Sequence, residues 1–225
     1  MVKKRIILLF LITLSVTFIY AQELLTAERF LERVSDHYTT IRDFEASVTI
    51  RSGNTEMVGN LIYLSPSFLR IDFTRPAEQV IVFNGEVLTV FVPELRAVLS
   101  QNVNQRRAGS VGAGSAQGLS MLRRNYVASF VTGPNPEPLD GTGERVVRIR
   151  LTRRSVAESF REIILSINPD TMMIRRMEGR TVADGEVRLD FTNVRTNVGI
   201  PEQRFVYDHP GLANVYHNFL FRDID

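Results

Sequence analysis

The chain has 225 residues and contains neither cysteine nor tryptophan. The lack of cysteine excludes disulfides and also excludes a lipid-modified N-terminal cysteine. The 27 basic residues outnumber the 25 acidic ones, but Lys3, Lys4 and Arg5 belong to an N-terminal leader. Without them, 24 basic residues face 25 acidic ones, and this net charge of about −1 does not support nucleic-acid binding.

Residues 1–21 have the layout of a secretory signal peptide. The three basic residues precede an uncharged apolar run from Ile6 to Tyr20, and Ala21 supplies a small residue at the cleavage point. We therefore expect export to the periplasm, with residues 22–225 forming a single mature domain. Ile19 stands where a small residue is preferred and the apolar run is long, so a retained membrane anchor is the alternative.

A helix and then a strand open the mature chain. Thr26 can cap a helix that ends near Thr40, because apolar residues recur in this stretch at spacings of three and four. From Phe44 to Arg51 the period changes to two, which predicts a strand with one apolar face.

Further apolar runs, each bounded by proline, glycine or asparagine, predict consecutive strands. They cover residues 58–64, 68–73, 80–83, 87–92, 97–103, 146–151, 163–167, 172–177 and 187–191. Asn84-Gly85, between two of these runs, is typical of a type I′ hairpin turn. A meander of about ten or eleven antiparallel strands must curl or close to manage its twist and its edges.

Helical material interrupts this meander. Residues 105–118 are rich in arginine, glycine, serine and alanine, which predicts a flexible loop. After the loop, apolar residues at spacings of three and four predict a helix over residues 119–129. The tail from Gly211 to Asp225 has no pattern that assigns it a place.

The sequence offers little for catalysis. Its three histidines are His37, His209 and His217, and no two of them have the spacing of a metal-binding pair. The glycines from Gly112 to Gly118 overshoot the spacing of a dinucleotide-binding loop by one residue, and no nucleophile elbow is present. We therefore expect that the protein is not an enzyme and that it binds neither a metal ion nor a cofactor.

Residues 58–73 carry more apolar side chains than one dry sheet face requires, because residues of both parities are apolar. Something must therefore cover each face of these strands. One interpretation is an ordinary closed core. The other is that the N-terminal helix and the 119–129 helix cover one face incompletely or separably, which leaves room for a lipid chain.

Three stretches occur in a specific order: a glycine-led strand with a proline turn at Gly59–Ile71, a hairpin at Gln79–Leu88, and a proline turn at Val92-Pro93. Together they resemble the characteristic run of the bacterial outer-membrane lipoprotein carrier (LolA) family. The second half is similar as far as Tyr207, so that the resemblance covers most of residues 24–208.

The resemblance implies an α+β fold, a curved antiparallel half-open β-barrel whose concave hydrophobic side is closed by helices. It also implies a monomeric, non-enzymatic chaperone for acylated lipoproteins. Such a carrier receives its cargo from an inner-membrane ATP-driven releasing complex and gives it to an outer-membrane acceptor or to the outer membrane itself. The alternative is a membrane-anchored or periplasmic lipid-binding module of the same fold that senses envelope stress.

Positions carried over from that family place Leu69 and Ile71 on the inward side of the sheet and Leu119 and Leu122 in a lid. We predict that nine residues line the acyl-chain cavity: Phe44, Val48, Leu61, Leu69, Ile71, Phe73, Leu88, Leu119 and Leu122.

The sequence departs from the family at the lid. Ser65 stands where the resemblance implies a basic residue that tethers the lid, and Arg70 or Arg75 is the hypothetical substitute. The family's tryptophan positions are occupied by Ile71 and Thr89.

Overall fold

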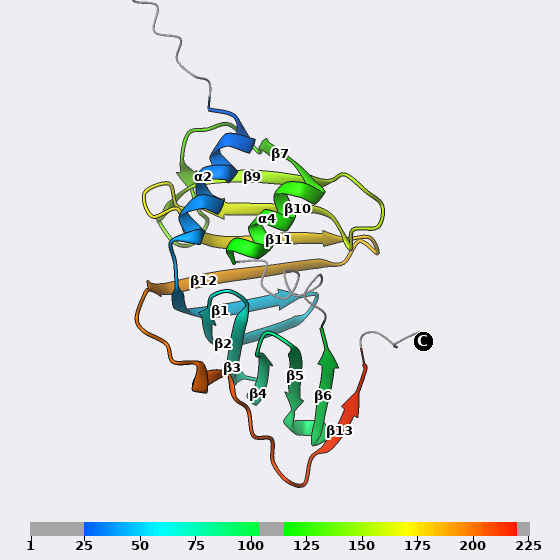
Figure 1. Cartoon of the computed structure of the whole chain (residues 1–225). Coiled ribbons are helices and arrows are strands. Elements are labelled where there is room, and N and C mark those ends of the chain that lie inside the picture. The colour runs from blue at the N-terminus through cyan, green and yellow to red at the C-terminus, as the bar shows by residue number, and fades with distance from the viewer. Residues whose placement is uncertain (1–24, 104–114, 220–225) are drawn as a thin grey trace, which may run out of the picture.

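A computed structural model describes residues 25–103 and 115–219, and one large sheet dominates them (Figure 1). The strands pair in the order β13-β6-β5-β4-β3-β2-β1-β12-β11-β10-β9-β7, with β8 beside β9. Every pair is antiparallel except β13 with β6. The bounds are β1 (Asp43–Ser52), β2 (Thr55–Leu64), β3 (Phe68–Arg75), β4 (Ala77–Phe83), β5 (Val87–Val92), β6 (Ala97–Asn102), β7 (Tyr126–Phe130), β8 (Glu137–Pro138), β9 (Arg145–Arg153), β10 (Phe160–Ile167), β11 (Ile174–Thr181), β12 (Glu186–Thr196) and β13 (Asn214–His217).

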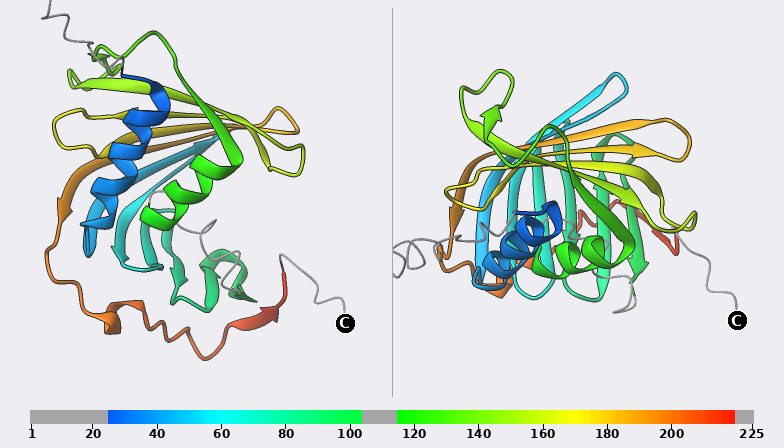
Figure 2. Two further views of the ribbon diagram at one scale, coloured as in Figure 1. Left: turned by 45° about the horizontal axis from the view of Figure 1, so that its top comes forward. Right: turned by 90° about the horizontal axis from the view of Figure 1, so that it is seen from above.

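The sheet curves around two helices, α2 (Ala27–Thr39) and α4 (Ala116–Asn125), which lie on its concave side (Figure 2). Its end strands β7 and β13 do not pair with each other, so the described sheet stays open. This architecture confirms the predicted curved, half-open antiparallel barrel with helices on its concave side.

Helix α2 forms where its apolar spacing predicts. The Thr26 side-chain oxygen accepts a hydrogen bond from the backbone N–H of Arg29 at 3.2 Å, which caps the helix, and Glu28 lies favourably in the first turn. The buried face carries Phe30, Leu31, Val34 and Tyr38 among others.

Helix α4 is shifted from its predicted position at residues 119–129. It begins earlier because the Ser115 hydroxyl accepts a hydrogen bond from the Gly118 N–H at 3.1 Å and caps it. It also ends earlier, because Tyr126 already has an extended backbone and starts β7 beside β9. The prediction is wrong at both ends, since pairing with a distant strand is not visible in local apolar spacing.

Ten strands correspond to predicted runs, and three were missed. Strand β7 was assigned to the helix, β8 has only two residues, and β13 lies in the tail that carried no pattern. The Asn84-Gly85 hairpin is confirmed, but the type I′ turn is wrong. Gly85 alone of these two residues has a positive φ, and the Asn84 side-chain oxygen accepts hydrogen bonds from the N–H groups of Glu86 (3.1 Å) and Val87 (2.8 Å).

Two predicted segments fall on residues that the structure does not describe. The signal peptide, residues 1–21, lies wholly outside the described residues. The same holds for most of the predicted flexible loop at 105–118, of which only residues 115–118 are described, as the start of α4 and its cap.

The apolar residues of the strands bury on two different faces, which explains their surplus. Along β2, Leu61 and Tyr63 belong to the concave core with the helices. The alternate residues Ile62 and Leu64 belong to a cluster on the convex face. The second cover is the chain between β12 and β13, from which Phe205 packs into the convex cluster and is only 1% exposed. Both faces of β2 are therefore covered over residues 61–64.

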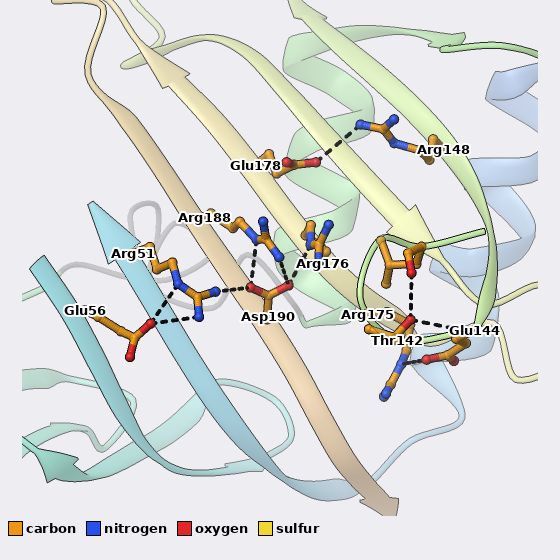
Figure 3. A network of polar contacts seen from close by, with 11 residues as sticks. Arg51, Glu56, Thr142, Glu144, Arg148, Arg175, Arg176, Glu178, Arg188 and Asp190 are labelled. Carbon is orange, nitrogen blue, oxygen red and sulfur yellow. Dashed lines mark hydrogen bonds and ion pairs between the residues drawn. The ribbon is translucent and has the colours of Figure 1, made fainter. Parts of the chain in front are cut away.

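The convex face of β9–β12 is polar instead (Figure 3). Asp190 accepts hydrogen bonds from Arg176 at 2.6 Å, from Arg188 at 2.8 Å and from Arg51 at 3.0 Å. Partial burial raises the pKa of Asp190, but hydrogen bonds and charge from Arg188 and Arg176 outweigh that effect, and the net pKa is lowered. This network lies on the side of the sheet opposite the helices (Figure 3).

Candidate functional site

The concave face of the sheet, beneath α2 and α4, is the candidate site. The two helices contact each other and β7. Their inward residues, including Leu31 (1% exposed), Val34 (0%) and Leu119 (0%), share one apolar core with side chains from the strands. An apolar layer between a sheet and two helices is the type of place where an acyl chain could be sheltered from water.

The structure brings seven of the nine predicted cavity residues together in this core. Their exposed fractions lie between 0% and 8%, and they are Phe44, Val48, Leu61, Ile71, Phe73, Leu119 and Leu122. Leu88 lies apart in a smaller cluster with Phe83 and Val103, and Leu69 contacts both clusters.

Seven of the predicted lining residues are buried in the surrounding core. Two hollows are described, and neither is lined by any of the nine residues. One is a polar groove of about 810 Å³ at the hairpin ends of the sheet, with Arg51, Glu178 and Arg188 among its walls. The other is a pocket of about 360 Å³ beside α2, with Arg123 and Arg154 among its walls.

The concave face continues beyond the helices across β4, β5 and β6 (Figures 1 and 2). Ile71 pairs with Ile81, Ile81 with Val90, and Val90 with Leu99, so these four side chains form one row across four strands. Ile71 is buried, and the next three are only partly buried. The sequence did not reveal the role of this row, because β4 and β5 are apolar at both parities and either face could have been the concave one.

A cluster of hydroxyl groups holds the start of α4 against the sheet. Tyr63 on β2 donates a hydrogen bond to the carbonyl oxygen of Pro66 at 2.9 Å. Burial raises the pKa of Tyr63, and hydrogen bonds with the hydroxyls of Ser65 and Ser115 oppose the rise. Since Ser115 also caps α4, this cluster links the helix directly to the turn between β2 and β3.

Helix α2 is anchored separately. The Tyr38 hydroxyl accepts a hydrogen bond from the backbone N–H of Ile174, the first residue of β11, at 3.1 Å, and burial raises the pKa of Tyr38 to about 12. Between the helices, Arg123 and Glu32 form an ion pair at 2.7 Å whose side chains are one-third to one-half exposed, so it contributes little stability. At the other end of α4, the Asn125 carbonyl oxygen accepts a hydrogen bond from the Arg154 N–H at 2.8 Å, and Tyr126 continues directly into β7.

This geometry agrees with the result of a family comparison. Residues 39–208 match the model of the family described as "Outer membrane lipoprotein carrier protein LolA". The chain belongs to the LolA family. The family match spans the first strands, α4 and the convex covering segment, and so includes every element of the candidate site except most of α2.

Individual relatives of the LolA-family chain are distant. A protein of Methylococcus capsulatus named "Outer-membrane lipoprotein carrier protein" is 25% identical over 164 residues, which are 71% of this chain and 72% of the relative. An uncharacterised conserved protein of Thermus thermophilus superposes with a TM-score of 0.56 at 12% identity, covering 85% of this chain and 98% of that one. The Pseudomonas aeruginosa MucA/MucB complex superposes with a TM-score of 0.51 at 15% identity, covering 81% of this chain and 61% of that one. At these identities, the solved structures establish a shared fold.

The substitute lid tethers proposed from the sequence are wrong. Arg70 projects from the opposite face of β3, where it pairs with Asp72 at 2.8 Å and donates a hydrogen bond to the Arg204 carbonyl oxygen at 3.0 Å. Arg75 pairs with Glu56 at 2.8 Å, and Glu56 also pairs with an arginine of the convex network. Both arginines therefore serve the convex side of the sheet, opposite α4.

Within the described ranges, no group of three or more metal-ligating side chains comes together. His37 lies in the last turn of α2, and His209 and His217 are exposed in the C-terminal segment. The same ranges contain no helix that is both long enough and apolar enough to cross a membrane.

Proposed function

We propose that this chain is a periplasmic carrier that shelters the acyl chains of lipoproteins between its concave sheet face and helices α2 and α4. One observation carries the proposal. A continuous apolar face, in the fold of the LolA family, is covered by two helices that pack on it through apolar side chains. The name of the Methylococcus capsulatus relative supports the same function.

Binding would exchange one apolar contact for another. Moving α4 away uncovers Leu119 and Leu122, together with Leu61 and Ile71 beneath them. An acyl chain that takes their place returns about 0.8 kcal/mol for each methylene it buries. Because the gain on binding offsets the loss on opening, the net affinity can be moderate, which suits a carrier that must release its cargo.

The partly buried row of Ile81, Val90 and Leu99 offers a first contact for the chain. It is continuous with the buried Ile71 through cross-strand pairing. A lipid chain that lands on β5 or β6 could therefore slide under α4 without leaving an apolar surface.

The remaining parts of the proposal concern partners. An inner-membrane ATP-driven releasing complex would load the carrier, and an outer-membrane acceptor or the outer membrane itself would unload it. The carrier would act as a monomer and as a non-enzymatic chaperone without a cofactor, after cleavage of residues 1–21.

A second candidate is a lipid-binding module that senses envelope stress. The fold similarity to the MucA/MucB complex, at a TM-score of 0.51, favours it as the alternative. The two differ in their use of the leader, because a carrier that moves between membranes needs the leader removed, whereas a sensor can keep it as an anchor.

Native mass spectrometry would test the proposal on residues 22–225, purified from a bacterial envelope with and without a co-expressed triacylated lipoprotein. The carrier function predicts a stoichiometric complex with that lipoprotein. A matched experiment uses the same lipoprotein with its acylated cysteine replaced, which should leave the protein empty. A protein that is empty in both cases would refute the carrier function.

A further inference from the structure

Two exposed leucines lie in neighbouring turns at the end of the sheet farthest from α2 (Figure 1). Leu95 is 72% exposed and Leu212 is 88% exposed. Leu95 ends the short 3-10 helix η1 (Pro93–Leu95) between β5 and β6, and Leu212 lies just before β13. In Figure 1 both segments are at the lower end of the molecule.

The two leucines occupy equivalent places in two similar turns. In the first, the Arg96 N–H donates a hydrogen bond to the Pro93 carbonyl oxygen at 3.0 Å; in the second, the Ala213 N–H donates one to the Pro210 carbonyl oxygen at 2.9 Å. Each leucine is thus the third residue of a closed four-residue turn.

The strand register sets these turns next to each other. β13 and β6 pair in parallel, with Asn214 opposite Ala97, and the Asn214 N–H donates a hydrogen bond to the Arg96 carbonyl oxygen at 2.8 Å. Leu95 and Leu212 each lie two residues before this pair, so both turns stand at the same end of the paired strands.

The fold holds both leucines outward. Their neighbours Ala97 and Ala213 pack inward, Ala97 being 6% exposed and Ala213 lying against the convex apolar cluster that contains Val98. With these alanines in the inward positions, both leucines remain exposed to solvent.

We propose that Leu95 and Leu212 form a tip that docks shallowly into the surface of a lipid bilayer. Two leucines on convex turns offer only a small part of the ~1,000 Å² that a specific protein interface buries. A bilayer, by contrast, accepts protruding apolar side chains without a complementary shape. Tyr216, 53% exposed and two residues into β13, lies where an aromatic ring suits the membrane interface, and Arg96 lies beside the tip, near lipid phosphates.

This docking tip is distinct from the concave acyl-chain site and would act when the carrier meets a membrane. The tip is also about as far from α2 as the sheet allows (Figure 1), so docking leaves the helices free. The contact would be weak and reversible, since it rests on two side chains.

Tryptophan fluorescence tests the tip without background, because the chain contains no tryptophan. Single variants Leu95→Trp and Leu212→Trp are mixed with vesicles of phosphatidylethanolamine and phosphatidylglycerol. Both should show a blue-shifted emission and quenching by brominated acyl chains. The control Val156→Trp, at a position 84% exposed in the β9–β10 loop, should show neither.

Three results would overturn the proposal. One is an unchanged spectrum for both tip variants, and another is an equal shift for Val156→Trp. The third is a blue shift that grows with protein concentration in the absence of vesicles, which would mean that a second copy of the chain covers the leucines.

Removal of the leucines gives an independent measurement. The double variant Leu95→Ser/Leu212→Ser should lower the vesicle partition coefficient by about tenfold or more, whereas Val156→Ser should leave it unchanged. Native mass spectrometry should find the double variant as loaded with lipoprotein as the wild type. A wild-type protein that carries no lipoprotein would refute the carrier function but not the tip. A double variant whose vesicle partition coefficient equals that of the wild type would refute the tip but not the carrier function.

Discussion

Replacing Tyr63 by phenylalanine tests whether the hydroxyl cluster keeps α4 closed. The variant loses the hydrogen bond to the Pro66 carbonyl oxygen and the hydrogen bonds with Ser65 and Ser115, while the buried ring and its packing remain. Of these, only the Ser115 bond joins Tyr63 to α4, and it is worth about 0.5–1.5 kcal/mol in the closed state. Since about 1.4 kcal/mol is tenfold in an equilibrium constant, the open population of α4 should rise about two- to tenfold.

Two measurements follow this change. Amide hydrogen exchange should become about two- to tenfold faster in α4 of Tyr63→Phe, and stopped-flow uptake of a fluorescent acyl probe should accelerate to a similar degree. Tyr38→Phe is the matched control, because it leaves the buried Ile174 N–H without its acceptor, which costs about 1–3 kcal/mol at a site away from α4. The control should lower global stability without faster uptake.

Unchanged amide exchange of α4 in Tyr63→Phe would show that the hydroxyl cluster does not hold α4 closed. The same conclusion would follow if both tyrosine variants accelerated uptake equally, since that result would attribute the effect to general loss of stability.

Three other changes probe the site, the convex network and the sheet. Leu119→Asn should reduce acyl-probe uptake by a larger factor than Leu31→Asn at equal loss of unfolding free energy, and equal losses in both would identify Leu119 as plain core. Asp190→Asn should destabilise the protein at neutral pH. Because the folded-state pKa of Asp190 is lowered, the stability that its carboxylate contributes is present above the ordinary pKa of 3.8 and is lost as the pH falls through the folded-state pKa. The urea midpoints of the wild type and the Asp190→Asn variant should therefore become equal in acid. A difference between the midpoints that stays constant with pH would contradict the lowered pKa. Gly59→Ala should lower the free energy of unfolding by about 1–3 kcal/mol, because the new Cβ would lie 2.6 Å from the Asp72 carbonyl oxygen. The control Gly133→Ala, which has open space around it, should be nearly neutral in thermal unfolding. Similar melting temperatures for the two variants would show that β3 shifts to accommodate the methyl group.

The candidate site was predictable where family resemblance and strand alternation agreed. Leu61, Ile71 and Phe73 lie on one parity of β2 and β3, and the structure buries all three in the concave core. Leu88 was assigned to the same lining but packs with Phe83 and Val103. In β4 and β5 both parities are apolar, so alternation alone could not separate the residues near the helices from those beyond them.

The polar contacts around α4 were beyond sequence reasoning. Tyr63 was visible only as an apolar strand residue, and Ser115 fell in a stretch assigned to a loop. The two residues meet because α4 folds back over β2, and this contact joins positions that are far apart in the chain. A basic residue was sought near Ser65, and the structure has a group of hydroxyls there instead.

By itself, the amino-acid sequence determined helix α2, ten of the strands, the hairpin at Asn84-Gly85 and membership of a carrier-like family. These features depend on local periodicity, capping and turn chemistry, which act between near neighbours in the chain. Tertiary structure alone decided that Tyr126–Phe130 is a strand, that the segment around Phe205 seals the convex face, and that Leu95 and Leu212 share one tip. In each of these cases the deciding hydrogen bonds or apolar contacts join distant segments, and they form only once the sheet has curved and its two faces are covered.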